Sequence, residues 1–451
     1  MQPSTSPATP AGKANPAIAA NQDQASLNWI EVIAVRSLIV LFVLFSLLPY
    51  GISWDYAGTS ELTMEGSLNT KLEWGSLFLI SGILLIRHLP QTLRYLRAIN
   101  PFLLLLILWC LASTLWSPLP AVTFKKAIQL FGLVMIGLAI QLSDRPLNLF
   151  ASDLRYTLTA ILIASFFVAV AIPSIGIDYE LGNAWRGILS QKNELGQVAA
   201  LCFLLWQVST CLGQTSLRSM VIGLLFCFFV LVMSKSSTSL AMAILSSFLF
   251  HLFRKQRIGS NYSLTRVFLS IGMLIILMTF AFYMFESRMP TYGEVSGPIA
   301  GLFGKGSDLT GRTDIWQLID LEIARHQWIG LGYGAFWLGP GSLSQYIIDA
   351  LYWVPLQSHN GYLDILNEQG LIGMGFAILC LAKQFQQLFL MSYVDRLQAA
   401  FWGTMLVVVI ITNFTESSLF RGFGFQNVLF IFALMTVTSS LKRLKEATAQ
   451  A

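Results

Sequence analysis

The stretch SHNGYLDILNEQGLIG, residues 358–373, sets a histidine, an asparagine and a carboxylate beside an apolar pattern of helical period. Polar groups in or next to hydrocarbon cost free energy, so they are kept where they pair with one another or serve a function. Apolar residues continue to about residue 383, which is long enough for a helix that crosses a bilayer. The stretch therefore predicts a membrane helix whose polar residues, His359, Asn360 and Glu368, act on something at one face of the membrane.

The composition of the whole chain is that of an integral membrane protein. Of its 451 residues, 55% are hydrophobic and only 11% are charged, and the mean hydropathy is +0.65. Ordinary globular domains are about one quarter charged. The net charge of +5 comes without a basic and aromatic cluster on a water-soluble face, so nucleic acid is not an expected partner. The five cysteines and four histidines follow no disulfide or metal-ligand spacing, and we expect no cofactor.

Apolar runs long enough to cross hydrocarbon recur along the chain and predict about twelve helices. They lie near residues 32–52, 74–90, 101–117, 124–142, 156–174, 193–212, 217–234, 238–253, 265–285, 360–383, 398–414 and 423–441. The sequence thus predicts an all-α integral membrane protein. Its longest connection, which follows the ninth span, is expected to contain short helices at the membrane interface.

The distribution of lysine and arginine predicts which ends of these helices face the cytoplasm. The even-numbered loops and the C-terminus hold most of the basic residues: Arg87, Arg94, Arg97, Arg254, Lys255, Arg257, Arg266, Lys442, Arg443 and Lys445. The first odd-numbered loop is acidic, with Asp55, Glu61, Glu65 and Glu73. Lys125 and Lys126 break the pattern and are interpreted as residues that snorkel to the interface. Both termini are therefore expected in the cytoplasm, whereas Arg36 in the first span has no assigned partner.

These observations divide the chain into five parts. Residues 1–30 are rich in Pro, Ala, Ser and Thr, lack the apolar core of a signal peptide and are read as a disordered cytoplasmic tail. Residues 31–285 form a membrane domain of nine helices, and residues 286–358 form the long external loop. Residues 359–441 contain the last three helices, and residues 442–451 form a second cytoplasmic tail.

Within the long loop, residues 308–328 have a helical pattern. Ile315, Leu318, Ile319 and Ile323 fall on one stripe, which suits a helix lying along the membrane surface. Arg312 stands near the N-terminus of this helix, where a cation gains nothing from the helix dipole. Two interpretations remain open: a surface ion pair with Asp308 or Asp314, or an anion-binding guanidinium helped by free backbone N–H groups.

Further polar residues gather on the same external side. The segment 183–196 carries Arg186, Lys192 and Asn193, the segment 233–242 carries Lys235, and the loop before the last span carries Glu416 and Arg421. The cations are either headgroup anchors or, if they converge, a site for a doubly charged anion such as a diphosphate.

Aromatic residues and a histidine complete this external set. Tyr333 and Trp337 lie in a glycine-rich run at 329–355, and they are either interfacial anchors or platforms for sugar rings. His359 is either an ordinary interfacial residue or a group that transfers a proton near neutral pH. Gly370 and Gly373 are expected to let another helix approach closely.

As an ordered set, these motifs resemble the O-antigen ligase and O-antigen polymerase superfamily, and most closely its exopolysaccharide polymerase branch. His359-Asn360, followed after nine residues by Gly370-x-x-Gly373, is similar to the histidine motif of that superfamily. GRTDIW at 311–316 and GLGYGAFW at 330–337 resemble its preceding loop motifs, and WRGILSQKNELG at 185–196 resembles another segment. The resemblance covers about residues 183–425.

The resemblance implies an inverting, metal-independent membrane glycosyltransferase of the bacterial inner membrane, with its active site facing the periplasm. The donor would be an undecaprenyl-pyrophosphate-linked oligosaccharide, and the product a polymer of repeat units. Arg186 and Arg312 would hold the pyrophosphate, and His359 would orient or deprotonate the acceptor hydroxyl. The remaining predicted substrate-binding residues are Lys192, Asn193, Lys235, Asp314, Tyr333, Trp337, Asn360 and Arg421. Lys192 and Lys235 are included on electrostatic grounds alone.

Other functions remain open at the level of sequence. An O-antigen ligase would transfer the glycan to lipid A core instead of a second glycan chain. A polytopic transporter of a lipid-linked or anionic substrate would use the external cations as a vestibule, but transporters usually show internal repeats and polar residues at the membrane midplane. A scaffold for other polysaccharide-assembly proteins would not need the cations. Membrane lipids are expected partners in every case.

Overall fold

The computed structural model of this chain describes residues 27–48, 68–143, 146–179, 182–255 and 312–450. Within these ranges, the first half of the chain contains α2 (Trp29–Leu47), α4 (Leu68–Arg87), α5 (Leu89–Leu96), α6 (Pro101–Ala112), η1 (Ser113–Leu115), α7 (Pro120–Ile140), α8 (Pro146–Ala171), α9 (Pro173–Gly176), β1 (Ile177–Asp178) and β2 (Ala184–Trp185). The second half contains α10 (Lys192–Cys211), α11 (Leu217–Met233), α12 (Ser237–Lys255), α15 (Arg312–Arg325), α16 (Gln345–Leu351), α17 (Gly361–Met391), α18 (Arg396–Thr412) and α19 (Phe425–Gln450). The two strands form a short antiparallel pair, so this part of the chain is almost entirely helical.

The helices match the predicted spans. In the described ranges, seven helices are long and apolar enough to cross a membrane, and α4 with α5, bent by 102°, forms an eighth candidate. Three shorter apolar helices are Pro101–Leu115, Leu217–Met233 and Arg396–Thr412. Every predicted span except the ninth coincides with one of these helices. The ninth, at 265–285, lies outside the described residues, as do the tail at 1–26, the acidic segment at 49–67 and the loop at 286–311. The prediction of an all-α integral membrane protein is confirmed.

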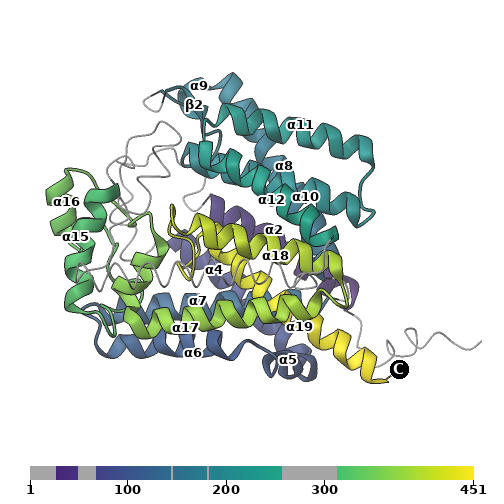
Figure 1. The fold of residues 1–451 in the computed structure, drawn as a ribbon, viewed down its shortest axis with the longest axis horizontal. Helices are drawn as coiled ribbons and strands as arrows, with labels where there is room; N and C mark the ends of the chain where they lie inside the picture. The colour runs from purple at the N-terminus through teal and green to yellow at the C-terminus, as the bar shows by residue number, and fades with distance from the viewer. Residues whose placement is uncertain (1–26, 49–67, 144–145, 180–181, 256–311, 451) are drawn as a thin grey trace, which may run out of the picture.

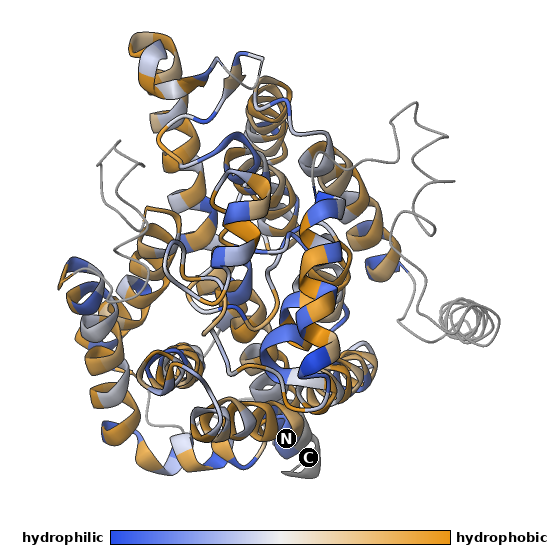
Figure 2. Ribbon diagram, turned by 90° about the vertical axis from the view of Figure 1, so that its left-hand side faces the viewer, coloured by the Kyte–Doolittle hydropathy of each residue, from blue (hydrophilic) through white to orange (hydrophobic). Residues whose placement is uncertain are grey.

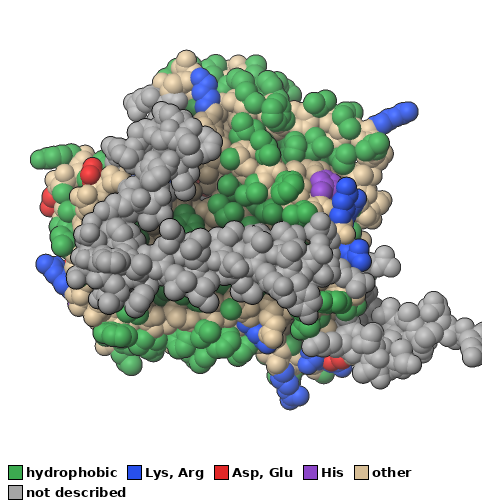
Figure 3. Space-filling view, in the orientation of Figure 1, with side chains coloured by type: hydrophobic (Ala, Val, Ile, Leu, Met, Phe, Trp, Pro, Cys, Tyr) green, Lys and Arg blue, Asp and Glu red, His purple; other side chains and the backbone are tan. Residues whose placement is uncertain are grey.

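The long helices run side by side, and the two short helices α15 and α16 stand across one end of them (Figure 1). Figure 2 looks onto this end and shows hydrophilic stretches near the centre of the view, with mostly hydrophobic helices around them. In Figure 3, hydrophobic side chains cover much of the helix surface facing the viewer. Apolar surface of this kind is stable against lipid rather than water, as expected for a membrane domain.

The ion pair between Arg36 and Asp153 explains the arginine that the sequence left without a partner. Arg36 in α2 donates from Nε and Nη2 to the two carboxylate oxygens of Asp153 in α8, at 3.0 and 2.7 Å. The Asp153 side chain is buried, with 5% exposure. A charge in that position needs a partner, because an uncompensated buried charge is strongly destabilising.

Helix α15 confirms the predicted helix in the long loop. Its apolar stripe, however, packs against other residues of the protein and not along the membrane surface. Ile315, Trp316 and Ile319 are buried, and they pack with Phe336 of the following loop and Ile347 of α16. The stripe was expected to face the membrane surface. It is covered instead by the protein's own residues, which fixes α15 and the residue at its start, Arg312, relative to α17.

Helix α17 is interrupted at Gly370, which has φ 66° and ψ −170°. The loop before Tyr333 fills the break with four backbone hydrogen bonds, two of which join Gly332 N to Glu368 O (2.8 Å) and Leu371 N to Gln327 O (2.7 Å). A Cβ atom on Gly370 would lie 2.4 Å from the carbonyl carbon of Trp328. The expectation that Gly370 admits another helix is therefore wrong, since it admits the loop backbone.

Candidate functional site

The loop between α18 and α19 lies directly on the start of α17. Asn413 organises this loop, because its Oδ1 accepts hydrogen bonds from the backbone N–H groups of Ser418 (3.0 Å) and Leu419 (2.9 Å). Gly361 N donates to Asn413 O at 2.9 Å. A Cβ atom on Gly361 would come within 2.0 Å of Asn413 Oδ1, so only glycine allows this approach. The consequence is that Glu416 lies beside His359.

Glu416 joins the two residues that the sequence singled out. Its Oε1 accepts a hydrogen bond from Arg312 Nη2 at 3.2 Å, and its Oε2 lies 3.1 Å from His359 Nδ1. Arg312 also donates from Nη1 to Thr415 O at 2.6 Å. The three side chains are 17–21% exposed, so they are enclosed but reachable. Arg312 thus pairs with Glu416, and Asp314, one of the two partners expected from sequence, is exposed on the first turn of α15.

Two groups lie within hydrogen-bond distance of His359 Nδ1: Glu416 Oε2 at 3.1 Å and Gln357 Nε2 at 3.2 Å. An ionised carboxylate only accepts hydrogen bonds, so we assign the proton of the neutral imidazole to Nδ1. Gln357 Nε2 then donates to the same Glu416 oxygen at 3.1 Å. His359 Nε2 is left unprotonated and able to accept a proton. A carboxylate that orients an imidazole in this way also stabilises the imidazolium that forms when the proton arrives.

The backbone around His359 supports this geometry. His359 has φ 56°, in the left-handed region, where a non-glycine residue is uncommon and its strain must be offset by its surroundings. Asn360 is the N-cap of α17, and its Oδ1 accepts from Tyr362 N at 3.1 Å. Asn360, predicted to bind substrate, therefore has a capping function in this structure.

A pocket opens next to Arg312 and Glu416, and we call it the amphipathic pocket. It holds about 840 Å³ of empty space, including its open mouth. The polar residues that line it are Asn193, Gln197, Ser236, Thr238, Ser239, Ser246, Arg312, Thr412, Thr415, Glu416 and Gln426. Its apolar residues are Ala200, Leu201, Leu204, Met242, Met405, Val408, Val409, Phe425 and Leu429, from α10, α12, α18 and α19. Such a pocket suits a ligand with a charged head and a hydrocarbon chain.

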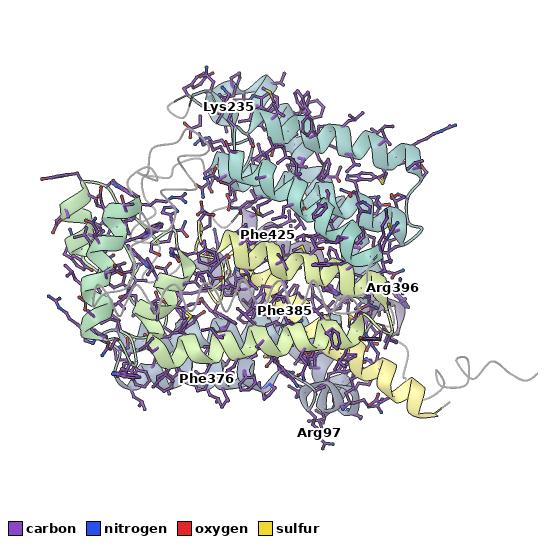
Figure 4. The ribbon with its side chains drawn as sticks, in the orientation of Figure 1. Arg97, Lys235, Phe376, Phe385, Arg396 and Phe425 are labelled. Carbon is purple, nitrogen blue, oxygen red and sulfur yellow. The ribbon has the colours of Figure 1, made fainter. Side chains whose placement is uncertain are left out.

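Arg186, Lys192 and Lys235, the predicted cations of the segments 183–196 and 233–242, do not line this pocket. Arg186 donates from Nε to Ile175 O at 2.8 Å, and Lys235 donates from Nζ to Gly182 O at 2.6 Å. Figure 4 shows Lys235 at the edge of the molecule near α9 and β2. Asn193 directly follows Lys192, and it does line the pocket. Of the cations predicted to converge from separate segments, Arg312 lines this pocket, whereas the guanidinium of Arg186 contacts the Ile175 carbonyl in α9.

A second pocket, which we call the charged pocket, lies on the other side of the loop that carries Glu416. It holds about 720 Å³ of empty space, including its mouth. Its lining includes the charged residues Lys126, Asp364, Glu368 and Arg421, with Tyr333, Gly334, Trp337, Leu338, Gly361, Ile365, Gln369, Ser417, Leu419, Phe420, Gly422 and Phe423. Lys126 was interpreted as a snorkelling residue. It instead faces this pocket.

Arg421 is fixed on the wall of the charged pocket. Its Nη1 donates to Asp364 Oδ2 at 2.8 Å, and its Nη2 donates to Leu356 O. Trp337 Nε1 donates to the second oxygen of the same carboxylate, Asp364 Oδ1, at 2.7 Å. Trp337 is only 6% exposed, so it is not an interfacial anchor.

Tyr333 is likewise part of the protein interior rather than of the membrane interface. It is 3% exposed, and its hydroxyl donates to Phe420 O at 2.7 Å. Burial raises the pKa of the Tyr333 phenol, which therefore stays protonated and remains a donor. The hydrogen bond ties the glycine-rich loop to the segment before α19 and helps to shape the charged pocket.

Sequence reasoning missed several residues of this region. Glu416 was noted only as an external residue, although it proves to be the partner of Arg312 and His359. Gln357, Asp364 and Lys126 were not predicted to be residues of the functional site. Lys126 could have been noticed, because it breaks the positive-inside pattern. Glu368 lies in the stretch 358–373, which predicted a polar group at one face of the membrane.

Comparison with known proteins agrees with this picture. The family described as O-antigen ligase matches residues 222–378, which include Arg312, Trp337 and His359 but end before Glu416. The exopolysaccharide production protein ExoQ of Rhizobium meliloti (strain 1021) is 34% identical over 91 residues. That match covers 19% of this chain and 21% of ExoQ, so the chain matches about a fifth of the length of this curated relative. Both matches support the resemblance to the O-antigen ligase and O-antigen polymerase superfamily that the motifs carry.

Proposed function

We propose that this protein is a membrane glycosyltransferase that joins repeat units of a surface polysaccharide, using an undecaprenyl-pyrophosphate-linked oligosaccharide at the periplasmic face of the inner membrane. The observation that carries the proposal is the position of Glu416. This one carboxylate holds a guanidinium and an imidazole at the mouth of a pocket with an apolar interior. An anionic leaving group attached to a long hydrocarbon chain requires this combination.

In the proposed complex, the polyprenyl chain lies along the apolar residues of the amphipathic pocket, and the diphosphate lies at Arg312. A planar guanidinium binds phosphate oxygens through two parallel hydrogen bonds. Hydrogen-bond donors that are already fixed near the leaving group stabilise the transition state without having to reorganise as negative charge develops. This stabilisation is largest where water is partly excluded. Asn193 and Ser236 add hydrogen-bonding groups to the same mouth. Arg186, Lys192 and Lys235 contribute positive potential from the adjacent segments.

The chemical step in this scheme is a direct displacement. The hydroxyl oxygen of the acceptor forms a bond to the anomeric carbon of the donor sugar. The bond from that carbon to the diphosphate oxygen breaks, and undecaprenyl diphosphate leaves with the electron pair. The hydroxyl proton passes to His359 Nε2, and Glu416 stabilises the imidazolium. Attack from the side opposite the leaving group inverts the anomeric configuration. Arg312 neutralises the departing charge in place of a metal ion.

Reconstitution with matched controls tests this proposal. Purified protein in liposomes receives the lipid-linked repeat unit, and product length is read on gels. His359→Ala and Arg312→Ala should each lower transfer at least about 100-fold, a typical contribution of a positioned acid or base. His326→Ala and Arg325→Ala change the same residue types at the C-terminal end of α15, where both side chains pair with Glu322. They should retain wild-type activity.

Two outcomes would contradict the proposal. One is wild-type polymer from His359→Ala or Arg312→Ala protein, and the other is export of the intact lipid-linked glycan without a new glycosidic bond, which identifies a transporter. The name of the matched family favours a ligase as the second candidate. Transfer that begins only after lipid A core is added would select that ligase, whereas the match to ExoQ favours the polymerase.

A further inference from the structure

We infer that the charged pocket binds the acceptor saccharide. This inference rests on the glycosyl transfer proposed above and adds which surface holds the second substrate. Lys126, Asp364, Glu368 and Arg421 line the charged pocket, and their formal charges cancel. A balanced set of this kind favours a neutral, polyhydroxylated ligand over a diphosphate. The lining lacks the run of aliphatic residues that the amphipathic pocket has, so it does not suit a hydrocarbon chain.

Several groups in this pocket have hydrogen-bonding capacity to spare. Within the described ranges, no hydrogen bond or ion pair engages the Lys126 ammonium, although it faces the charges of Glu368 and Arg421. The carboxylate of Glu368 accepts one hydrogen bond, from the backbone N–H of Gly334 at 2.8 Å. The hydroxyl of Ser417, also on the lining, is buried and has no partner among the residues the structure describes. Sugar hydroxyls both donate and accept, so they can satisfy an ammonium, a carboxylate and a hydroxyl together.

The buried Ser417 hydroxyl costs free energy until it is paired, because an unsatisfied buried donor or acceptor is destabilising. A ligand that pairs this hydroxyl removes a cost already present in the protein. Trp337 and Phe423 line the same pocket and offer apolar surface for the C–H face of a pyranose ring. Charged groups combined with aromatic rings distinguish a saccharide site from a simple ion site.

The place of the pocket relative to His359 supports an acceptor rather than an unrelated sugar. Glu416 lines the amphipathic pocket, and the next residue, Ser417, lines the charged pocket. Gly361, two residues after His359, also lines the charged pocket. The segments that carry Glu416 and Ser417, and His359 and Gly361, therefore form a partition between the two pockets, although His359 itself lines neither. A sugar held in the charged pocket brings its hydroxyl to the imidazole from the side opposite the diphosphate, as direct displacement requires.

Hydrogen bonds run through this partition from one pocket to the other. Gln357 Nε2 donates to Glu416 Oε2 at 3.1 Å, and Gln357 Oε1 accepts from Arg421 Nη1 at 3.4 Å. Arg421 in turn pairs with Asp364. Both pockets are thus built on one connected set of side chains, so an acceptor that contacts Arg421 is positioned relative to Glu416 and His359.

Binding measurements separate the two pockets. The probe is the lipid-free repeat-unit oligosaccharide, prepared by depolymerising the host polysaccharide and titrated into purified full-length protein. Lys126→Met should weaken its binding at least tenfold, Lys126→Arg should restore much of it, and Ser417→Ala should weaken it a few-fold, the size of one hydrogen bond. Lys125→Met, a change of the adjacent lysine that lines neither pocket, should have no effect. Binding of undecaprenyl diphosphate should stay unchanged in all four variants, which also shows that each is folded.

The inference is overturned if Lys126→Met and Ser417→Ala bind the oligosaccharide as the wild type does while the wild type elongates lipid-linked glycan. It is also overturned if the variants lose undecaprenyl diphosphate and oligosaccharide to the same extent. If Lys126→Met does not fold, Ser417→Ala and Lys126→Arg decide the question. A wild-type protein that binds the oligosaccharide but forms no glycosidic bond contradicts the proposed function instead.

Discussion

At the scale of single residues, Glu416 determines what Arg312 and His359 can do. Each of its carboxylate oxygens serves one of them, at 3.2 and 3.1 Å. Without the negative charge, the imidazole loses the acceptor that holds its proton on Nδ1, and the imidazolium loses its stabilising partner. The guanidinium also loses the bond that aims it at the mouth of the amphipathic pocket.

Glu416→Gln should therefore lower the rate of glycan transfer by roughly 100-fold, near the lower end of what a general base contributes. The neutral amide keeps the shape of the side chain, so undecaprenyl diphosphate should still bind. Initial rates of polymer formation in liposomes measure the effect. Glu322→Gln is the matched control, because Glu322 also pairs with an arginine and a histidine, but its partners Arg325 and His326 are 71% and 44% exposed and line neither pocket. A Glu416→Gln protein as active as that control would contradict the role of Glu416.

The residue scale also shows where prediction from sequence ends. His359 and Arg312 were identified by their motifs, and they do meet at one carboxylate. Their shared partner was not identified, because Glu416 lies 57 residues from His359 and 104 residues from Arg312 along the chain. No periodicity connects positions so far apart. Asn413 and Gly361, which bring the two segments together, carry ordinary signals of a helix end and a helix start.

At the scale of elements, the break in α17 fixes the loop that shapes the charged pocket. Gly370 adopts φ 66°, and the backbone of Trp328 and Ile329 occupies the place of its missing side chain. The helices themselves were predictable from runs of apolar residues. The break was not, because it depends on hydrogen bonds that the loop from Gln327 to Gly332 supplies.

Gly370→Ala should destabilise the protein by at least about 1–3 kcal/mol, because alanine is strained at positive φ and its Cβ would collide with backbone. Thermal unfolding of the detergent-solubilised protein measures the change as a lower midpoint. Gly375→Ala is the control in the same helix, since a Cβ atom there has nothing within 4 Å. If both variants unfold at the wild-type temperature, the loop is not held by the break.

At the scale of the whole molecule, α10, α12, α18 and α19 line the amphipathic pocket, together with Arg312 at the start of α15 and residues of the α11–α12 and α18–α19 connections. Composition and hydropathy predicted the membrane class and the helices of the described ranges. They could not predict two pockets divided by one loop, because that division depends on how α10, α12 and α18 pack. Nor could they predict that Lys126 faces the second pocket.

Filling the apolar part of the amphipathic pocket should block the donor. Leu201→Trp adds a large ring to the lining from α10, and it should weaken binding of undecaprenyl diphosphate at least tenfold, because the chain and the ring compete for one volume. Leu225→Trp makes the same change at an exposed position on α11, and it should bind like the wild type. Titration of the lipid in detergent compares them, and equal affinities would place the polyprenyl chain elsewhere.

The shared carboxylate of Glu416 also bears on the order in which substrates act. A diphosphate that engages Arg312 draws the guanidinium away from Glu416, and the full negative charge of Glu416 is then left to His359. The imidazole becomes a better proton acceptor only when a donor is in place. An enzyme built in this way activates the incoming alcohol after the leaving group has docked, so its kinetics should follow a compulsory sequence with the lipid diphosphate first.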